Sequence, residues 1–113
     1  MSARDTVARQ VDAYNAHDLE RYLACFTDDV VIASGNGDAM LEGIEAVRAQ
    51  YAEWFGRLHD LHAAVHHRIV RGGWVVDDEH VTAEGLDVEA LVAYHVRNER
   101  IDRVVLMTAE PEE

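Results

Sequence analysis

The stretch from Leu61 to Ala83 constrains the fold of this chain more than any other part of the sequence. It holds two runs in which apolar and polar residues alternate, and the pair Gly72-Gly73 separates them. Alternation with a period of two is typical of a β-strand with one buried face, and paired glycines supply the positive φ angles of a tight hairpin turn. The sequence therefore predicts a β-hairpin that turns at these two glycines.

A two-residue turn also predicts which residues of the two strands lie opposite each other. One face would carry the pairs Val70 and Val75, Arg68 and Asp77, and His66 and Glu79. The other face would carry Ile69 and Val76, His67 and Asp78, and Val65 and His80. Strands that serve structure alone seldom require opposite charges among apolar residues, so the first face is a candidate functional surface.

The composition excludes several classes of function. With 113 residues the chain is predicted to form one domain, residues 1–113. Its formal net charge of −12 repels phosphate backbones and anionic lipid surfaces, so we expect no nucleic-acid partner and no membrane partner. No apolar run is long enough to cross a bilayer and no apolar signal segment begins the sequence, so we expect a cytoplasmic protein.

The residue types that are absent narrow the chemistry further. All ten basic residues are arginines, which excludes lysine Schiff bases, pyridoxal phosphate attachment and a phosphate-loop lysine. Cys25 is the single cysteine, which excludes an internal disulfide and a multi-cysteine zinc site. Neither Ser2 nor Ser34, the two serines, lies in a G-x-S-x-G motif. Carboxylates, histidines, arginines and tyrosines remain, and we expect no cofactor.

Three segments before the hairpin carry apolar residues at helical spacing. The predicted helices span residues 2–16, which begin with a capping box at Ser2, residues 18–26, which Asp18 caps, and residues 43–58. A short strand is predicted at residues 30–33, and two more strands follow the hairpin at residues 87–96 and 101–108. Helices followed by four consecutive antiparallel strands give an α+β fold with the helices on one face of a curved sheet.

Several short segments of the chain occur together in a characteristic order. They are the helix joint at residues 14–18, the exit into a strand at 26–29, the helix start at 43–48, and strand segments at 68–70, 76–82 and 93–96. In this order they resemble the nuclear transport factor 2-like superfamily, in particular its SnoaL-like and ketosteroid isomerase-like branch. The resemblance implies a cone-shaped, cystatin-like α+β barrel, a pocket between the helices and the concave sheet face, and a homodimer.

The chain departs from the best-known chemistry of that superfamily. Its ketosteroid isomerases place a tyrosine on the first helix, an aspartate base after the first strand and a protonated aspartate on a later strand. The corresponding positions here are Gln10, Ser34 and Tyr94. Because a serine cannot act as the required carboxylate base, steroid isomerisation itself is not expected.

The charged face of the hairpin is the first candidate site. Asp77 or Glu79 would act as base, His66 as proton carrier and Arg68 as orienting cation. The resemblance supports these roles, since epoxide hydrolases and dehydratases of the superfamily use similar groups on the sheet. The alternative is cross-strand ion pairing at a dimer interface or in water, worth at most about 1 kcal/mol per pair.

Aromatic side chains form the second candidate site. Tyr14, Trp54 and Tyr94 would line a ligand pocket in which hydroxyl and indole groups act as donors, with Tyr51 as a further candidate. The alternative is plain core packing of the same rings.

A metal site is not expected. His59, His62 and His66 would align as metal ligands on a helix, but the third helix should end near Leu58, and on a strand these side chains are too far apart.

The sequence thus predicts a pocket protein for a small, largely apolar organic molecule. If it is catalytic, we expect a cofactor-independent isomerase, dehydratase or hydrolase. The alternative is a non-catalytic ligand-binding or dimerisation module with the same fold. In an enzyme the face of His66, Asp77 and Glu79 would point into a closed cavity, whereas in a scaffold it would face a partner chain or water.

Overall fold

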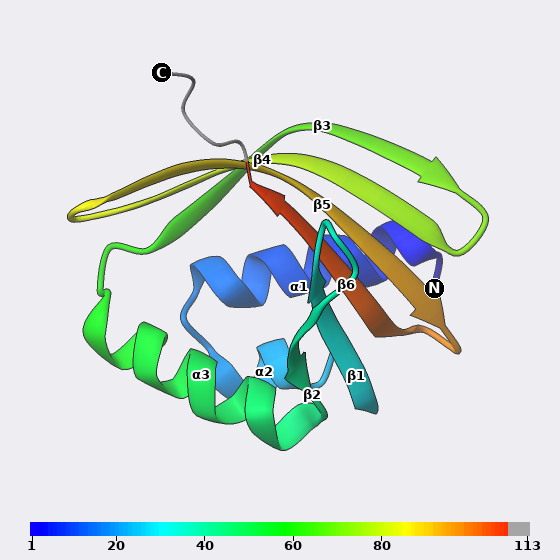
Figure 1. Ribbon diagram of the computed structural model, residues 1–113, viewed down its shortest axis with the longest axis horizontal. Coiled ribbons are helices and arrows are strands. Elements are labelled where there is room, and N and C mark those ends of the chain that lie inside the picture. Colours follow the sequence, from blue (N-terminus) through cyan, green and yellow to red (C-terminus); the bar gives the residue numbers. More distant parts are fainter. Residues whose placement is uncertain (109–113) are drawn as a thin grey trace.

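The computed structural model describes residues 1–108, which form three helices packed against one six-stranded sheet (Figure 1). The helices are α1 (Ala3–Asn15), α2 (Leu19–Leu23) and α3 (Ile44–Arg57). The strands are β1 (Phe26–Ser34), β2 (Ala39–Glu42), β3 (His62–Arg71), β4 (Trp74–Ala83), β5 (Leu86–Arg97) and β6 (Arg100–Thr108). Within this part of the chain, none of the helices combines the length and the apolar character that a membrane crossing requires.

Local hydrogen bonds set the starts of the first two helices. The Ser2 hydroxyl accepts a hydrogen bond from the backbone N–H of Asp5, whose carboxylate accepts one from the backbone N–H of Ser2, which confirms the capping box. The Asp18 carboxylate accepts a hydrogen bond from the first turn of α2. Between the two helices His17 has φ 54°, which makes the predicted sharp joint. The second helix is shorter than predicted, since Phe26 already belongs to β1.

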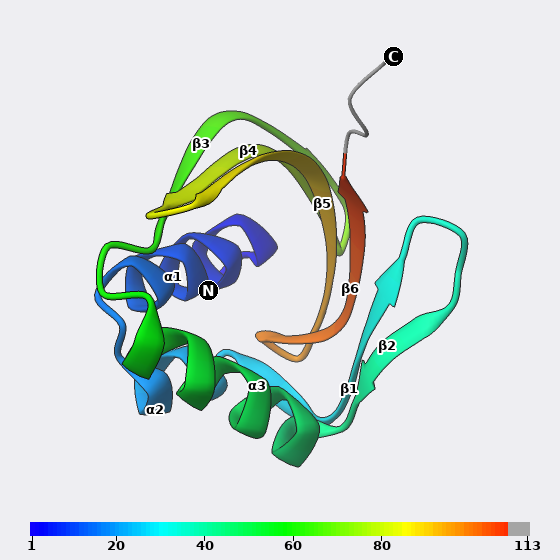
Figure 2. The same cartoon turned by 60° about the vertical axis from the view of Figure 1, so that its left-hand side comes forward.

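The sheet has the order β2-β1-β6-β5-β4-β3 and is antiparallel except where β1 runs parallel to β6. Figure 2 shows the sheet curving around α1, with α2 and α3 closing the open side. The predicted α+β fold and its four consecutive antiparallel strands are confirmed. The sequence did not predict β2, a short edge strand with an exposed burial pattern, or the full length of β1.

The hairpin of β3 and β4 turns at Gly72 and Gly73 as predicted, but the two glycines serve different purposes. Gly72 has φ 56°, where a side chain would be strained. Gly73 does not have a positive φ, so the prediction is wrong there. A Cβ at Gly73 would lie 3.0 Å from the carbonyl oxygen of Val96, and glycine therefore allows the β5–β6 end to approach the turn.

The predicted register holds near the turn and fails beyond it. Arg68 lies opposite Asp77, and the pairs of Val70 with Val75, Ile69 with Val76 and His67 with Asp78 are also confirmed. The register then shifts between Val65 and His67, so that Val65 lies opposite Glu79 and Ala64 lies opposite His80. His66 is the extra residue of a β-bulge. The predicted pairings of His66 with Glu79 and of Val65 with His80 are therefore wrong.

The core fills the space between the helices and the concave face of the sheet. Its most completely buried apolar side chains come from every layer of the fold: Val7, Val30, Val47, Val75 and Ile101. Asp77 is buried among them, with an exposed fraction of 0%. The concave face of the hairpin is thus the face that carries Arg68, Asp77 and Glu79.

Asn15 protects the open edge of β3. Its side-chain amide donates to the carbonyl oxygen of Ala63 at 2.9 Å and accepts from the backbone N–H of Ala63 at 2.8 Å. The amide therefore imitates a neighbouring strand at the edge of the sheet, where an unpaired backbone would otherwise lie against α1. This contact fixes the end of α1 to the wall of the fold.

Asn15→Ala should lower the free energy of unfolding by about 2 kcal/mol, because it leaves two partly buried backbone groups of Ala63 without partners. Urea denaturation followed by circular dichroism measures this loss. Asp12→Ala, on the exposed face of the same helix, is the matched control and should change the stability little. Equal effects of the two substitutions would contradict the role given to Asn15.

Candidate functional site

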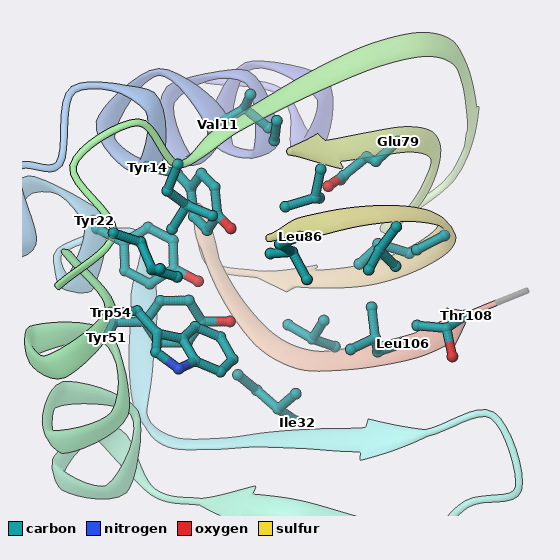
Figure 3. Close-up of a pocket in the computed structure, with 18 of the residues that line it drawn as sticks. Val11, Tyr14, Tyr22, Ile32, Tyr51, Trp54, Glu79, Leu86, Leu106 and Thr108 are labelled. Atoms are coloured by element: carbon teal, nitrogen blue, oxygen red, sulfur yellow. The ribbon is translucent and has the colours of Figure 1, made fainter. Parts of the chain in front are cut away.

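A cavity of about 460 Å³ lies between the helices and the concave face of the sheet (Figure 3). Aliphatic side chains of β1, β4, β5 and β6 make most of its sheet side, among them Ile32, Val81, Val88, Val92 and Leu106. Arg57 at the end of α3 and Glu84 on the exposed β4–β5 turn lie at one end of it. The volume falls in the range of small-molecule pockets, which are mostly apolar with a few polar groups.

Glu79 is the ionisable group inside this cavity. Its exposed fraction is 5%, and its carboxyl group points from β4 into the space beneath the sheet (Figure 3). The pKa of Glu79 is raised to about 7, chiefly by burial; the hydrogen bond from Tyr94 lowers it, the charge of Asp77 raises it and the charge of Arg68 lowers it. A carboxyl group with this pKa is partly protonated and partly ionised at neutral pH.

Tyr94 holds the Glu79 carboxyl group in place. The Tyr94 hydroxyl donates a hydrogen bond to Oε2 of Glu79 at 2.8 Å, and both side chains are buried. Burial, and then the neighbouring Glu79, raise the pKa of Tyr94 well above its ordinary value. Tyr94 is therefore a fixed neutral donor, and the second carboxyl oxygen of Glu79 remains available to the cavity.

The helices present three more phenol hydroxyls on the wall facing the sheet. Tyr14, Tyr22 and Tyr51 pack side by side with tilted rings, whose centroids are 5.9 Å apart for Tyr14 and Tyr22 and 4.8 Å apart for Tyr22 and Tyr51. Figure 3 shows their oxygen atoms directed into the cavity, with Trp54 next to them. Burial raises the pKa of all three tyrosines, so each stays protonated at neutral pH. The wall thus offers several neutral hydrogen-bond donors.

Gln10 adds a polar group without a partner. It lines the cavity from α1, one turn before Tyr14, and its exposed fraction is 4%. Its Oε1 atom is buried and makes no hydrogen bond with any of the described residues. A buried acceptor without a partner is destabilising, and a hydroxyl or N–H group of a ligand would satisfy it.

Arg68 and Asp77 form a buried ion pair behind the cavity. Nε of Arg68 lies 2.6 Å from Oδ1 of Asp77, and Nη2 lies 2.8 Å from Oδ2, which is the bidentate geometry of a strong pair. Neither residue lines the cavity. The expected alternative of ion pairing in water does not fit Asp77 or Glu79, because both are buried. The charges of the pair instead act on the pKa of Glu79, which Asp77 raises and Arg68 lowers.

His66 lies outside this group. The bulge turns it to the convex face of the sheet, where it is exposed and its ring centroid lies 6.1 Å from that of His80. It therefore cannot exchange a proton directly with Glu79, and the structure separates it from the other three residues predicted with it. Across residues 1–108 no three His, Cys, Asp or Glu side chains are grouped so that they could hold a metal ion.

The structure brings together most of the residues singled out from the sequence. Tyr14, Trp54, Glu79 and Tyr94 all line one cavity, as does Tyr51. The sequence reasoning did not identify Tyr22, because its helical spacing with apolar neighbours indicates only a core position. Gln10 was not predicted as a site residue either; the resemblance named it only as the position of a ketosteroid isomerase tyrosine, and a lone glutamine on a helix carries no signal of its own.

Comparisons with known proteins identify the relatives of the chain. The model of the SnoaL-like domain family matches residues 7–104. An uncharacterised cystatin-fold protein from Novosphingobium aromaticivorans is 30% identical, with a TM-score of 0.86 over 94% of this chain and 97% of that one. No curated protein matches.

Two more distant solved structures share the fold. An LEH-like epoxide hydrolase from M. tuberculosis is 17% identical, with a TM-score of 0.80 over 95% of this chain and 82% of that one. A hypothetical protein with a ketosteroid isomerase-like fold from Catenulispora acidiphila, solved in complex with trimethylamine, is 15% identical, with a TM-score of 0.75 over 89% of this chain and 82% of that one.

The raised pKa of Glu79 makes a prediction about stability. Glu79 has a pKa of about 7 in the folded protein and near 4.5 when unfolded, so between these values the folded state holds a proton that the unfolded state releases. Its contribution is therefore complete below pH 4.5 and is lost as the pH rises through 7. Between about pH 4.5 and pH 8 the wild type should lose about 3 kcal/mol of unfolding free energy relative to Glu79→Gln, measured by urea denaturation.

His66→Gln is the matched control, because it changes an ionisable side chain on the convex face. Between about pH 4.5 and pH 8, the unfolding free energy of His66→Gln should fall relative to that of Glu79→Gln by as much as that of the wild type does. A difference between wild type and Glu79→Gln that does not vary with pH would show that Glu79 titrates as an ordinary exposed carboxyl group.

Proposed function

We propose that this chain, which belongs to the SnoaL-like domain family, is a cofactor-independent acid/base catalyst for small, largely apolar organic molecules. The observation that carries the proposal is the Glu79 carboxyl group, which faces an apolar cavity and has a pKa of about 7. A general acid or base works best when its pKa lies near the operating pH, and burial among apolar groups is the usual way to raise a glutamate to that value.

Isomerisation of a carbonyl compound is the reaction that this site supports best. Glu79 takes a proton from a carbon that lies between the carbonyl group and a C=C double bond, and the electrons of that C–H bond form a dienolate. The protonated Glu79 then returns the proton to the far carbon of the former C=C bond, which moves the double bond next to the carbonyl group and regenerates the carboxylate. This cycle uses one carboxyl group as base and then as acid, and it consumes no water and no cofactor.

The tyrosine hydroxyls supply what the enolate oxygen requires. A developing negative charge is stabilised by fixed donors in a site that excludes water. The hydroxyls of Tyr14 and Tyr51 point into the cavity and stay neutral because burial raises their pKa. They would therefore bind a carbonyl oxygen while the apolar wall of the sheet holds the rest of the substrate.

Hydrolysis and dehydration fit the same site less well. Activation of a water molecule with protonation of a leaving group usually takes a second ionisable group beside the base. Asp77 is bound to Arg68 and does not line the cavity, and Glu84, the other lining carboxylate among the described residues, is exposed on a turn. The epoxide hydrolase of the same fold supports an enzymatic function for the fold, but it does not favour this choice of reaction.

Exchange of hydrogen for deuterium tests the proposal without a known substrate. A set of small cyclic and aromatic ketones is incubated with the protein in D₂O, and the loss of the signal from the carbon next to the carbonyl group is followed by proton NMR. The wild type should accelerate exchange for ligands that bind, and Glu79→Gln should reduce that rate by about a hundredfold or more, because it removes the base.

Tyr94→Phe separates a catalytic role of Glu79 from a structural one. The Tyr94 hydroxyl lowers the pKa of Glu79, so its removal should shift the midpoint of the exchange rate to higher pH. His66→Gln should leave the exchange profile unchanged. Ketones that bind but exchange equally in wild type and Glu79→Gln would favour the alternative function, a non-catalytic binding protein.

We also propose that the protein forms a homodimer through the convex face of the sheet. In register, Ile69, Val76, Ala93 and Val105 make an apolar row across four strands. Ile69 is 62% exposed and Leu91, also on this side of the sheet, is 48% exposed. An apolar patch of this kind on a sheet is typical of a protein interface, and the homodimer that the superfamily resemblance implies agrees with it.

Ile69→Arg and Leu91→Arg should each convert a dimer to a monomer, because a charge would be buried without a partner in the interface. Sedimentation velocity at micromolar concentration measures the change. Met40→Arg is the control, since Met40 is 57% exposed on β2, outside the apolar row. A monomeric wild type, or equal effects of all three substitutions, would contradict the proposed interface.

A further inference from the structure

Four arginines line a second hollow of the molecule, at the end of the sheet remote from the β4–β5 turn. This groove, of about 600 Å³, lies between α1, the end of α2 and the β5–β6 turn, and it shares no lining residue with the cavity around Glu79. Figure 1 shows the two turns at opposite ends of the sheet. The arginines are Arg9, Arg21, Arg97 and Arg100.

The positive charge of the groove is only partly neutralised. Arg97 lies 3.3 Å from Asp29 and 3.8 Å from Asp102, and Arg21 lies 4.0 Å from Asp18, at the limit of an ion pair. Arg9 and Arg100 form no ion pair with any of the described residues. The carboxylate that lines the groove, Glu99, is 3.0 Å from the amino group of Met1. The groove therefore remains cationic on a chain whose formal net charge is −12.

Thr27 provides a second, independent indication of a ligand. It lines the groove at the start of β1, and its exposed fraction is 9%. Its Oγ1 atom is buried and makes no hydrogen bond of ordinary length and angle within residues 1–108, although the hydroxyl lies near enough to Asp29 to lower the pKa of that carboxyl group. A buried hydroxyl without a well-formed hydrogen bond is unfavourable, and an oxygen atom of a bound anion would accept its proton.

We propose that this groove binds the phosphate group of a small organic molecule. Arginine presents a planar fork of donors that matches the oxygen atoms of a phosphate, and several arginines around one hollow make a site for more than one negative charge. The volume exceeds what an inorganic phosphate ion fills, so an organic part of the ligand would occupy the remainder. The net charge of −12 disfavours a large polyanion such as a nucleic acid.

The site is independent of the reaction proposed for Glu79. No residue of the groove belongs to the cavity, so loss of one activity would leave the other measurable. A regulator and the phosphate-bearing part of a second ligand would both be bound through the same contacts between arginines and a phosphate group. Binding of a phosphate compound is thus the property to measure.

Isothermal titration of the full chain with ADP tests the proposal, with adenosine as the uncharged match. ADP should bind and adenosine should not, at the same salt concentration. Arg9→Gln and Arg100→Gln should each weaken ADP binding by about tenfold or more, because each removes a charged hydrogen bond. Arg71→Gln, which removes the same charge at the hairpin turn, should leave the affinity unchanged.

Thr27→Val distinguishes a ligand contact from a mere packing defect. It should weaken ADP binding several-fold, while the free energy of unfolding stays the same or rises because a buried hydroxyl without a well-formed hydrogen bond has been removed. Unaltered affinity in Thr27→Val would count against the site. Equal loss in Arg71→Gln, or absence of ADP binding at millimolar concentration, would overturn the proposal. If inorganic phosphate bound as tightly as ADP, the inference that the ligand has an organic part would be overturned.

Discussion

The β-bulge at His66 decides which side chains of the hairpin face the helices. Without the extra residue, a regular ladder would place His66 opposite Glu79 on the concave face. With it, Val65 takes that position, and the concave face of β3 and β4 carries Arg68, Asp77 and Glu79 while the histidine lies outside. A bulge also increases the bend of the strand, which suits a sheet that wraps around α1 (Figure 2). The chemistry of the cavity therefore depends on one inserted residue in an edge strand.

The interior of the protein holds the ion pair of Arg68 and Asp77 next to the titrating carboxyl group of Glu79. Asp77 is fully buried but neutralised by the bidentate contact of Arg68, so its charge is satisfied inside the protein. Glu79 has no such cation and instead receives a hydrogen bond from Tyr94. The same face of one strand thus holds two carboxyl groups with different tasks. One fixes the sheet, and the other can exchange a proton with a ligand.

Local signals in the sequence predicted most of the fold and part of the site. Hydrophobic periodicity located the three helices, and Gly72-Gly73 located the hairpin turn, because each depends on neighbouring residues. The bulge could not be predicted, since nothing in the local pattern shows that strand curvature places His66 on the convex side. Tyr14 and Tyr94 were predicted as pocket residues because the family resemblance places them where the first helix and the sheet face each other. Tyr22 and Glu79 come to line the same cavity only when helices and sheet pack together.

The central claim is that Glu79 exchanges a proton near neutral pH inside an apolar cavity. Carbon-13 NMR of protein labelled at the glutamate side-chain carboxyl carbon, with Glu79→Gln to assign the signal, measures this property directly. We expect that signal to titrate with a pKa of about 7, and to shift when an apolar ketone fills the cavity. A pKa near the ordinary glutamate value of 4.5, unaffected by any ligand, would contradict the account.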